Sequence, residues 1–60
     1  MHSKARVRRL RATLREVIRE SISLEHEAMN LGLHGKAAGF ADVRQKAQAA
    51  INENSHLWEK

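Results

Sequence analysis

Apolar side chains recur at alternating steps of three and four residues along the first half of the chain. The series consists of Val7, Leu10, Leu14, Val17, Leu24, Ala28 and Leu31. Only Ser21 interrupts this spacing, which is the a/d pattern of a heptad repeat and predicts a helix over about residues 3–31, with Ser3 as its N-cap. The apolar arc is wide, as in a helix bundle, because three further apolar residues flank it: Ile18, Ile22 and Met29.

The three glycines are gathered in one short stretch, and the chain contains no proline. Gly32, Gly35 and Gly39 all lie within eight residues, with long Gly-free segments on both sides. This distribution predicts a helix, a loop over residues 32–39 and a second helix. Gly32 directly follows the last apolar position of the first helix, so we expect it to be the left-handed residue that ends that helix.

The second helix is expected over about residues 40–58. Its polar and apolar residues separate onto two sides of a helical wheel, which indicates an amphipathic helix packed against a neighbour. Asn54 is the single polar residue on the apolar side. That side otherwise consists of Phe40, Val43, Ala47, Ala50, Ile51, Leu57 and Trp58.

A chain of 60 residues forms one small domain, here expected to span residues 1–60. Folding must offset roughly 1.5 kcal/mol of ordering entropy per residue, and about fifteen large apolar side chains barely do so. The chain contains no cysteine, so disulfides cannot help. We therefore expect an all-α helical hairpin that self-associates into an antiparallel four-helix bundle dimer. Because the first helix would overhang the second, the predicted dimer interface consists of Val7, Leu10, Leu14, Val17 and Leu24.

Charge is distributed unevenly. Residues 1–19 contain seven basic groups and one acid, whereas residues 20–60 contain four basic groups and six acids. Five of the basic residues fall within an arc of about 80° at 100° per residue, and we call these five the basic stripe. The basic stripe consists of Lys4, Arg8, Arg11, Arg15 and Arg19.

The basic stripe carries two energetic costs that a partner would explain. Like charges four residues apart repel each other, and cations at a helix N-terminus oppose the helix dipole. We therefore expect the stripe to bind nucleic acid, which makes the protein a small non-enzymatic helical regulator. The alternative is a protein-interaction module, an adaptor or inhibitor that docks on an acidic surface of a larger protein. A solvated face that only maintains solubility is the third interpretation.

No constellation of catalytic or metal-binding residues is evident in the sequence. Glu25, His26 and Glu27 are adjacent, but on a helix they point about 100° apart and cannot share one ion. The serines lack a nucleophile elbow, and the glycine segment does not match a phosphate-binding loop. We expect no enzymatic activity, no cofactor, no metal and no small-molecule substrate.

Membrane association is also not expected. No stretch approaches the roughly 20 apolar residues of a membrane span, and the basic start is not followed by the apolar segment of a signal peptide. The predicted location is the cytoplasm.

Glu25 is a polar intrusion into the apolar arc of the first helix, one turn after Ser21. A buried charge is costly unless it is paired. Glu25 is therefore expected to meet a basic group across an interface, to fix the register of packing, or to lie in an exposed patch that forms a partner site.

Overall fold

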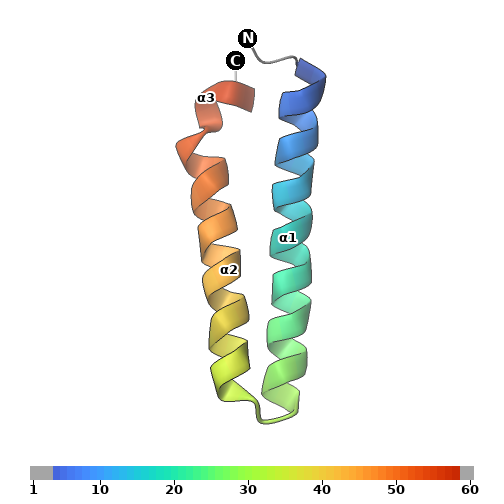
Figure 1. Ribbon diagram of the computed structural model, residues 1–60, viewed down its shortest axis with the longest axis vertical. Helices are drawn as coiled ribbons and strands as arrows, with labels where there is room; N and C mark the ends of the chain where they lie inside the picture. Colours follow the sequence, from blue (N-terminus) through green and yellow to red (C-terminus); the bar gives the residue numbers. More distant parts are fainter. Residues whose placement is uncertain (1–3, 59–60) are drawn as a thin grey trace.

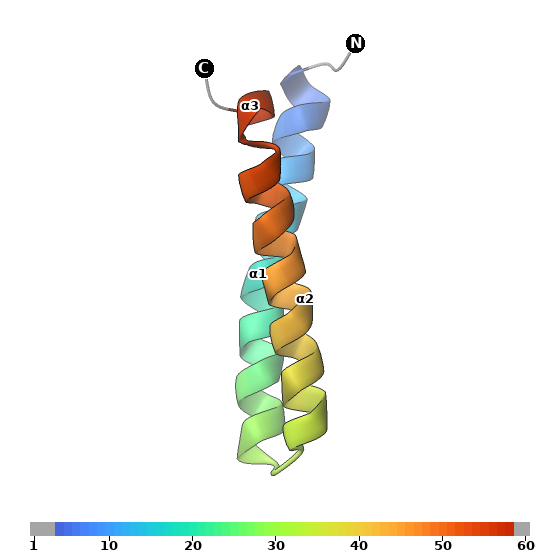
Figure 2. The same cartoon turned by 90° about the vertical axis from the view of Figure 1, so that its left-hand side faces the viewer.

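The computed structural model describes residues 4–58, and within that range the chain is helical except for a short turn over residues 31–33 and a break at Asn54. The elements are α1 (Lys4–Asn30), α2 (His34–Glu53) and α3 (Ser55–Trp58). The helices α1 and α2 run antiparallel and side by side along a molecule of 45 × 17 × 16 Å (Figure 1). Viewed from the side, they cross at a shallow angle (Figure 2). The predicted all-α helical hairpin is thus confirmed.

The turn between α1 and α2 ends the first helix as the sequence predicts. Gly32 has a φ of 76°, in the left-handed region that favours glycine. Its backbone N–H donates to the carbonyl of Met29 (3.0 Å), and that of Leu33 donates to the carbonyl of Ala28 (2.8 Å). These two bonds form a Schellman motif, which satisfies carbonyls that the end of α1 would otherwise leave unpaired. Ser3, the predicted N-cap, lies outside the described residues.

The predicted loop over residues 32–39 is wrong, because α2 begins at His34 rather than near residue 40. Gly35 and Gly39 lie inside α2 without a positive φ. Glycine in a helix interior destabilises the helix by about 1 kcal/mol relative to alanine. Tertiary packing can stabilise the helix by more than this. Ala37, which lies between the two glycines, is buried, and its packing favours helix through this segment.

The most deeply buried part of the interface between α1 and α2 consists of small side chains. The buried residues are Ser21 and Ala28 of α1 and Ala37 and Ala47 of α2, which we call the small-residue seam. Within residues 4–57, no large side chain is fully buried. Ser21, the interruption in the heptad pattern, donates its hydroxyl to the carbonyl of Val17 at 2.7 Å, so its burial leaves no unpaired hydroxyl.

The second helix stops at Asn54 instead of continuing to residue 58. The Asn54 side-chain amide donates to the carbonyl of Ala50 at 2.7 Å, competing with the backbone for that acceptor. The chain then bends, and Leu57 donates its N–H to the carbonyl of Asn54 at 2.9 Å as α3 begins. Leu57 is half-buried; the side chain of Trp58 lies outside what the structure describes.

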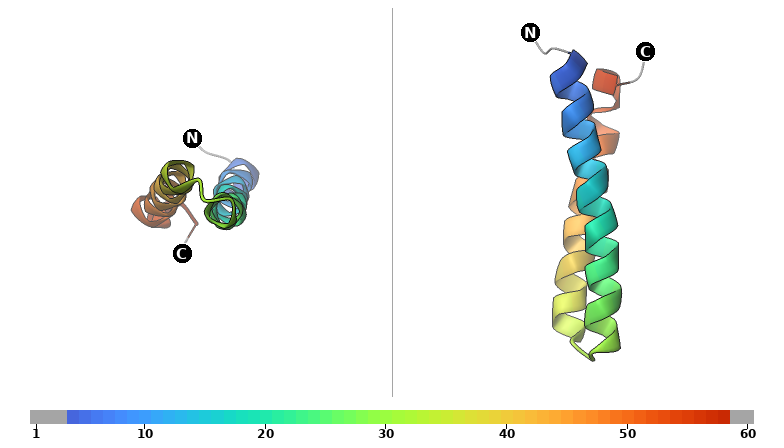
Figure 3. Two further views of the ribbon diagram at one scale, coloured as in Figure 1. Left: turned by 90° about the horizontal axis from the view of Figure 1, so that it is seen from below. Right: turned by 90° about the vertical axis from the view of Figure 1, so that its right-hand side faces the viewer.

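The overhang expected at the N-terminal end of α1 is absent. Because α2 starts early and α3 follows it, both together reach the first turns of α1 (Figures 1 and 3). Val7, Leu14 and Val17 are half-buried, whereas Leu10 and Leu24 are exposed. The five residues of the predicted dimer interface therefore have different surroundings within one chain. Neither α1 nor α2 contains a stretch long and apolar enough to cross a lipid bilayer.

Candidate functional site

A groove of about 770 Å³ lies at the open end of the hairpin, between the N-terminal half of α1 and α3. All five residues of the basic stripe line it, and we call it the basic groove. The other lining residues are Val7, Ala12, Glu16, His56 and Leu57. The basic stripe, which the helical period aligns along α1, thus forms one side of a concave surface.

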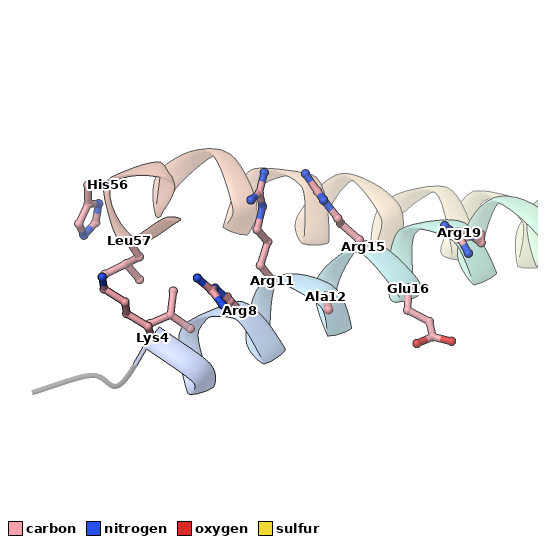
Figure 4. A pocket seen from close by; sticks show the side chains of 10 residues that line it. Lys4, Arg8, Arg11, Ala12, Arg15, Glu16, Arg19, His56 and Leu57 are labelled. Carbon is pink, nitrogen blue, oxygen red and sulfur yellow. The ribbon is translucent and has the colours of Figure 1, made fainter. Parts of the chain in front are cut away.

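Two elements shape the basic groove. The helix α1 supplies the cations, because steps of four and three residues return to one side of the helix. Arg11 and Arg15 extend from α1 toward α2, and Lys4 extends toward Leu57 and His56 (Figure 4). The end of the groove is closed by α3, whose position depends on the break at Asn54.

The charges in the basic groove are largely uncompensated. Within the described part of the chain, no carboxylate pairs with Lys4, Arg8, Arg15 or Arg19. Among the described residues of the lining, Glu16 is the one acid, and its side chain points away from Arg11 and Arg15 (Figure 4). The first turn of α1 contains no acidic residue, so the cations there act against the helix dipole without local relief.

Glu25 pairs with Arg44 of α2 rather than with a residue of the basic stripe. Its Oε1 lies 3.7 Å from the Arg44 Nε, and the two side chains are 22% and 36% exposed. From the sequence, Glu25 could pair with a basic group, fix the register of packing or lie in an exposed patch. The structure shows an ion pair, and both partners belong to the same chain. Because this acid is engaged in the turn-side part of α1 and does not line the groove, it does not neutralise the groove.

Sequence reasoning missed the residues that α3 adds to the site. His56 and Leu57 line the groove although they lie far from the basic stripe along the chain. The signal was Asn54, a polar residue on an apolar face, which marks the place where the helix breaks. Among residues 4–58, no three histidine or acidic side chains come together as possible metal ligands.

Comparisons of this chain with protein-family models, with curated proteins and with solved structures gave no match.

Proposed function

We propose that this protein is a small non-enzymatic regulator that binds the phosphate backbone of nucleic acid along the basic groove. One observation carries the proposal. Five cations from a single helix line one groove, and four of them have no acidic partner in the described part of the chain. Four of the five are arginines, whose planar guanidinium can donate two parallel hydrogen bonds to a phosphate.

The dimensions of the basic stripe suit a duplex backbone. From Lys4 to Arg19 the stripe covers about 22 Å at 1.5 Å per residue. One strand of a duplex carries about six phosphates over that length, against five cations here. No Phe, Tyr or Trp is among the described groove residues, so stacking of unpaired bases does not contribute from these positions. The expected binding is therefore driven by backbone charge, with little selection of sequence.

Two further statements belong to the proposal. The protein acts as a homodimer in which two hairpins form an antiparallel four-helix bundle, because the small-residue seam alone gives one chain little core. It acts in the cytoplasm, where a nucleic-acid partner is available.

The test is a salt titration of binding to a short fluorescein-labelled DNA duplex, followed by fluorescence anisotropy. The logarithm of the binding constant should fall linearly with the logarithm of salt concentration between about 50 and 200 mM. The double variant Arg8→Gln/Arg15→Gln should reduce the slope by about two, since each substitution removes one phosphate contact. Both side chains are exposed, so circular dichroism should show unchanged helicity.

The matched control is Arg6→Gln/Arg9→Gln. It removes the same charge from the same half of α1, but neither residue lines the groove. Equal losses in the two double variants would show that only net charge matters and would contradict a site in the groove. No salt-dependent binding by the unmodified protein to DNA or to an RNA duplex of the same length would contradict the proposal as a whole.

An acidic protein segment is the second candidate partner. The observation that favours it is the apolar part of the groove, to which Val7, Ala12 and Leu57 contribute beside the cations. An acidic amphipathic helix could bury its apolar face there. Affinity purification with and without nuclease separates the two candidates, because a protein retained after nuclease treatment would bind without a nucleic-acid bridge.

A further inference from the structure

A second depression lies at the opposite end of the molecule, next to the turn. It has a volume of about 190 Å³, and its lining is largely apolar. We call its lining the turn-end patch, which consists of Leu24, Glu27, Ala28, Leu31, Leu33, Lys36 and Phe40. Its leucines are poorly covered for their size: Leu31 is 69% exposed, and Leu24 and Leu33 are each 42% exposed. Apolar surface of this kind, contiguous and concave, is typical of a docking site.

The turn-end patch continues along one side of the hairpin. Three exposed leucines, Leu10 and Leu24 of α1 and Leu31 directly after it, fall within an arc of about 60° when the wheel of α1 is continued at 100° per residue. On the same wheel, the centre of this arc lies about 170° from the centre of the basic stripe. The exposed leucines and the basic groove therefore occupy opposite sides of α1, so a partner can cover one and leave the other open.

The charges of the turn-end patch are self-complementary. The patch contains one acid, Glu27 from α1, and one base, Lys36 from α2, and neither forms an ion pair within the described chain. A two-fold interface requires a surface that complements itself. If the two-fold axis runs along the length of the hairpin, α1 of one copy faces α2 of the other. Glu27 of each copy then meets Lys36 of the other.

The size of this side of the molecule also suits a second copy. A flank 45 Å long and about 17 Å wide is comparable to the roughly 800 Å² that each partner buries in a stable interface. The opposite flank is a poor alternative for self-association, because the basic grooves of two copies would repel each other there.

We propose that the turn-end patch and these three exposed leucines are covered by the same surface of a second copy, with the two turns at the same end of the dimer. This inference rests on the dimer in the proposed function and assigns its interface and its symmetry. Each helix then has antiparallel neighbours only. Both basic grooves lie at the other end of the dimer, on its outer sides.

The first experiment is sedimentation equilibrium of the full chain at tens of micromolar protein. Leu31→Gln should raise the dimer dissociation constant by about tenfold or more with unchanged helicity at high protein concentration, because Leu31 is largely exposed in one chain. The matched control is Ile22→Gln, which is 39% exposed but lies on the arc of the basic stripe. A folded monomer for the unmodified protein, or a larger effect of Ile22→Gln, would overturn the proposal.

The second experiment tests the contact between copies by exchanging charges. Glu27→Lys alone makes the patch doubly positive, and Lys36→Glu alone makes it doubly negative, so each variant should dimerise more weakly than the unmodified protein. An equimolar mixture should form heterodimers, since all four charges then meet opposites across the interface. A mixture that stays as dissociated as its components would overturn the assigned pairing.

The third experiment tests the symmetry. The chain has no cysteine, so Gly35→Cys provides a unique attachment site for a nitroxide label beside the turn, where an added Cβ meets no atom within 4 Å. Two turns at the same end place the labels much closer together than the 45 Å length of the molecule, whereas turns at opposite ends separate them by about that length. The longer distance, measured by double electron–electron resonance, would overturn the proposed symmetry. Because none of these variants alters a groove residue, failure of the interface leaves DNA binding as a separate result.

Discussion

The open end and the turn end of the hairpin are built on the same narrow interface but expose different chemistry. At the open end, α1 displays the basic stripe beside α3, and the apolar residues Val7 and Leu57 are half-buried. At the turn end, charge is balanced between Glu27 and Lys36, and Leu31 is among the most exposed large apolar side chains.

The contrast follows from which side chains are placed between the helices. The small-residue seam brings α1 and α2 close together and excludes large side chains from the middle of the interface. Large apolar and charged residues are consequently displaced to the flanks, where a second molecule can reach them. One end can therefore present a row of cations and the other an apolar patch without either disturbing the shared interface.

The largest expected effect comes from widening the shared interface, because this disturbs both ends at once. Ala28 is only 5% exposed, and Ala28→Leu would insert three carbon atoms between the helices. Overpacking of this kind costs about 1–3 kcal/mol, a large share of the stability of so small a domain. Urea unfolding followed by circular dichroism measures the loss. The control is Ala49→Leu, an exposed position on α2 that should unfold as the unmodified protein does.

A smaller effect is expected from Gly32, which acts at the turn end alone. With a φ of 76°, Gly32→Ala forces a Cβ into the left-handed region, at a cost of about 1–2 kcal/mol. Gly39→Ala should instead raise the free energy of unfolding by about 0.5–1 kcal/mol, because alanine favours helix over glycine and the added Cβ of residue 39 meets no neighbouring side chain within 4 Å. Thermal melts of the two variants compare them directly. Destabilisation by Gly39→Ala would show that α2 begins later than His34.

The pair between Glu25 and Arg44 joins α1 to α2 and should contribute about 0.5 kcal/mol. A double-mutant cycle with Glu25→Gln and Arg44→Gln measures the coupling energy. The comparison pair, Asp42 with Lys46, is shorter at 3.0 Å, but its side chains are 58% and 78% exposed. If burial matters more than distance, the pair between Glu25 and Arg44 has the larger coupling energy, and 1 M salt reduces that energy by a smaller fraction. The reverse ranking would mean that Glu25 has a minor structural role.

The features that were predictable from the sequence are those set within one helix or one turn. The basic stripe follows from the helical period alone, and the left-handed Gly32 follows from the end of an apolar series. Both depend on neighbours no more than a few residues away, so the structure retains them.

The features that could not be predicted depend on packing between helices. The start of α2 is not predictable locally, because the helix-breaking preference of Gly35 and Gly39 outweighs the helix preference of the two alanines between them, whereas the burial of Ala37 favours helix. The exposure of Leu24 was not foreseeable either, since a heptad pattern does not say which edge of the apolar arc the neighbouring helix covers. The α3 wall of the groove follows a helix break at Asn54, whose side-chain hydrogen bond to Ala50 is not encoded in the periodicity.

An effect about as small as that of the ion pair concerns the N-terminus of α2, at the turn end. Leu33 occupies the N-cap position without a side-chain hydrogen bond, and the first turn of α2 has no acidic residue. His34→Glu places a negative charge near the positive end of the helix dipole and should stabilise the hairpin by about 0.3–1 kcal/mol at low salt. The neutral variant His34→Gln isolates the charge, because its side chain has nearly the same size and shape as that of the charged variant. The difference between the two melting temperatures should disappear in 1 M salt, where the Debye length is only about 3 Å. A difference that persists at high salt would mean that the introduced carboxylate acts through a specific contact rather than through the helix dipole. That contact would then stabilise the turn end in addition to the Schellman motif.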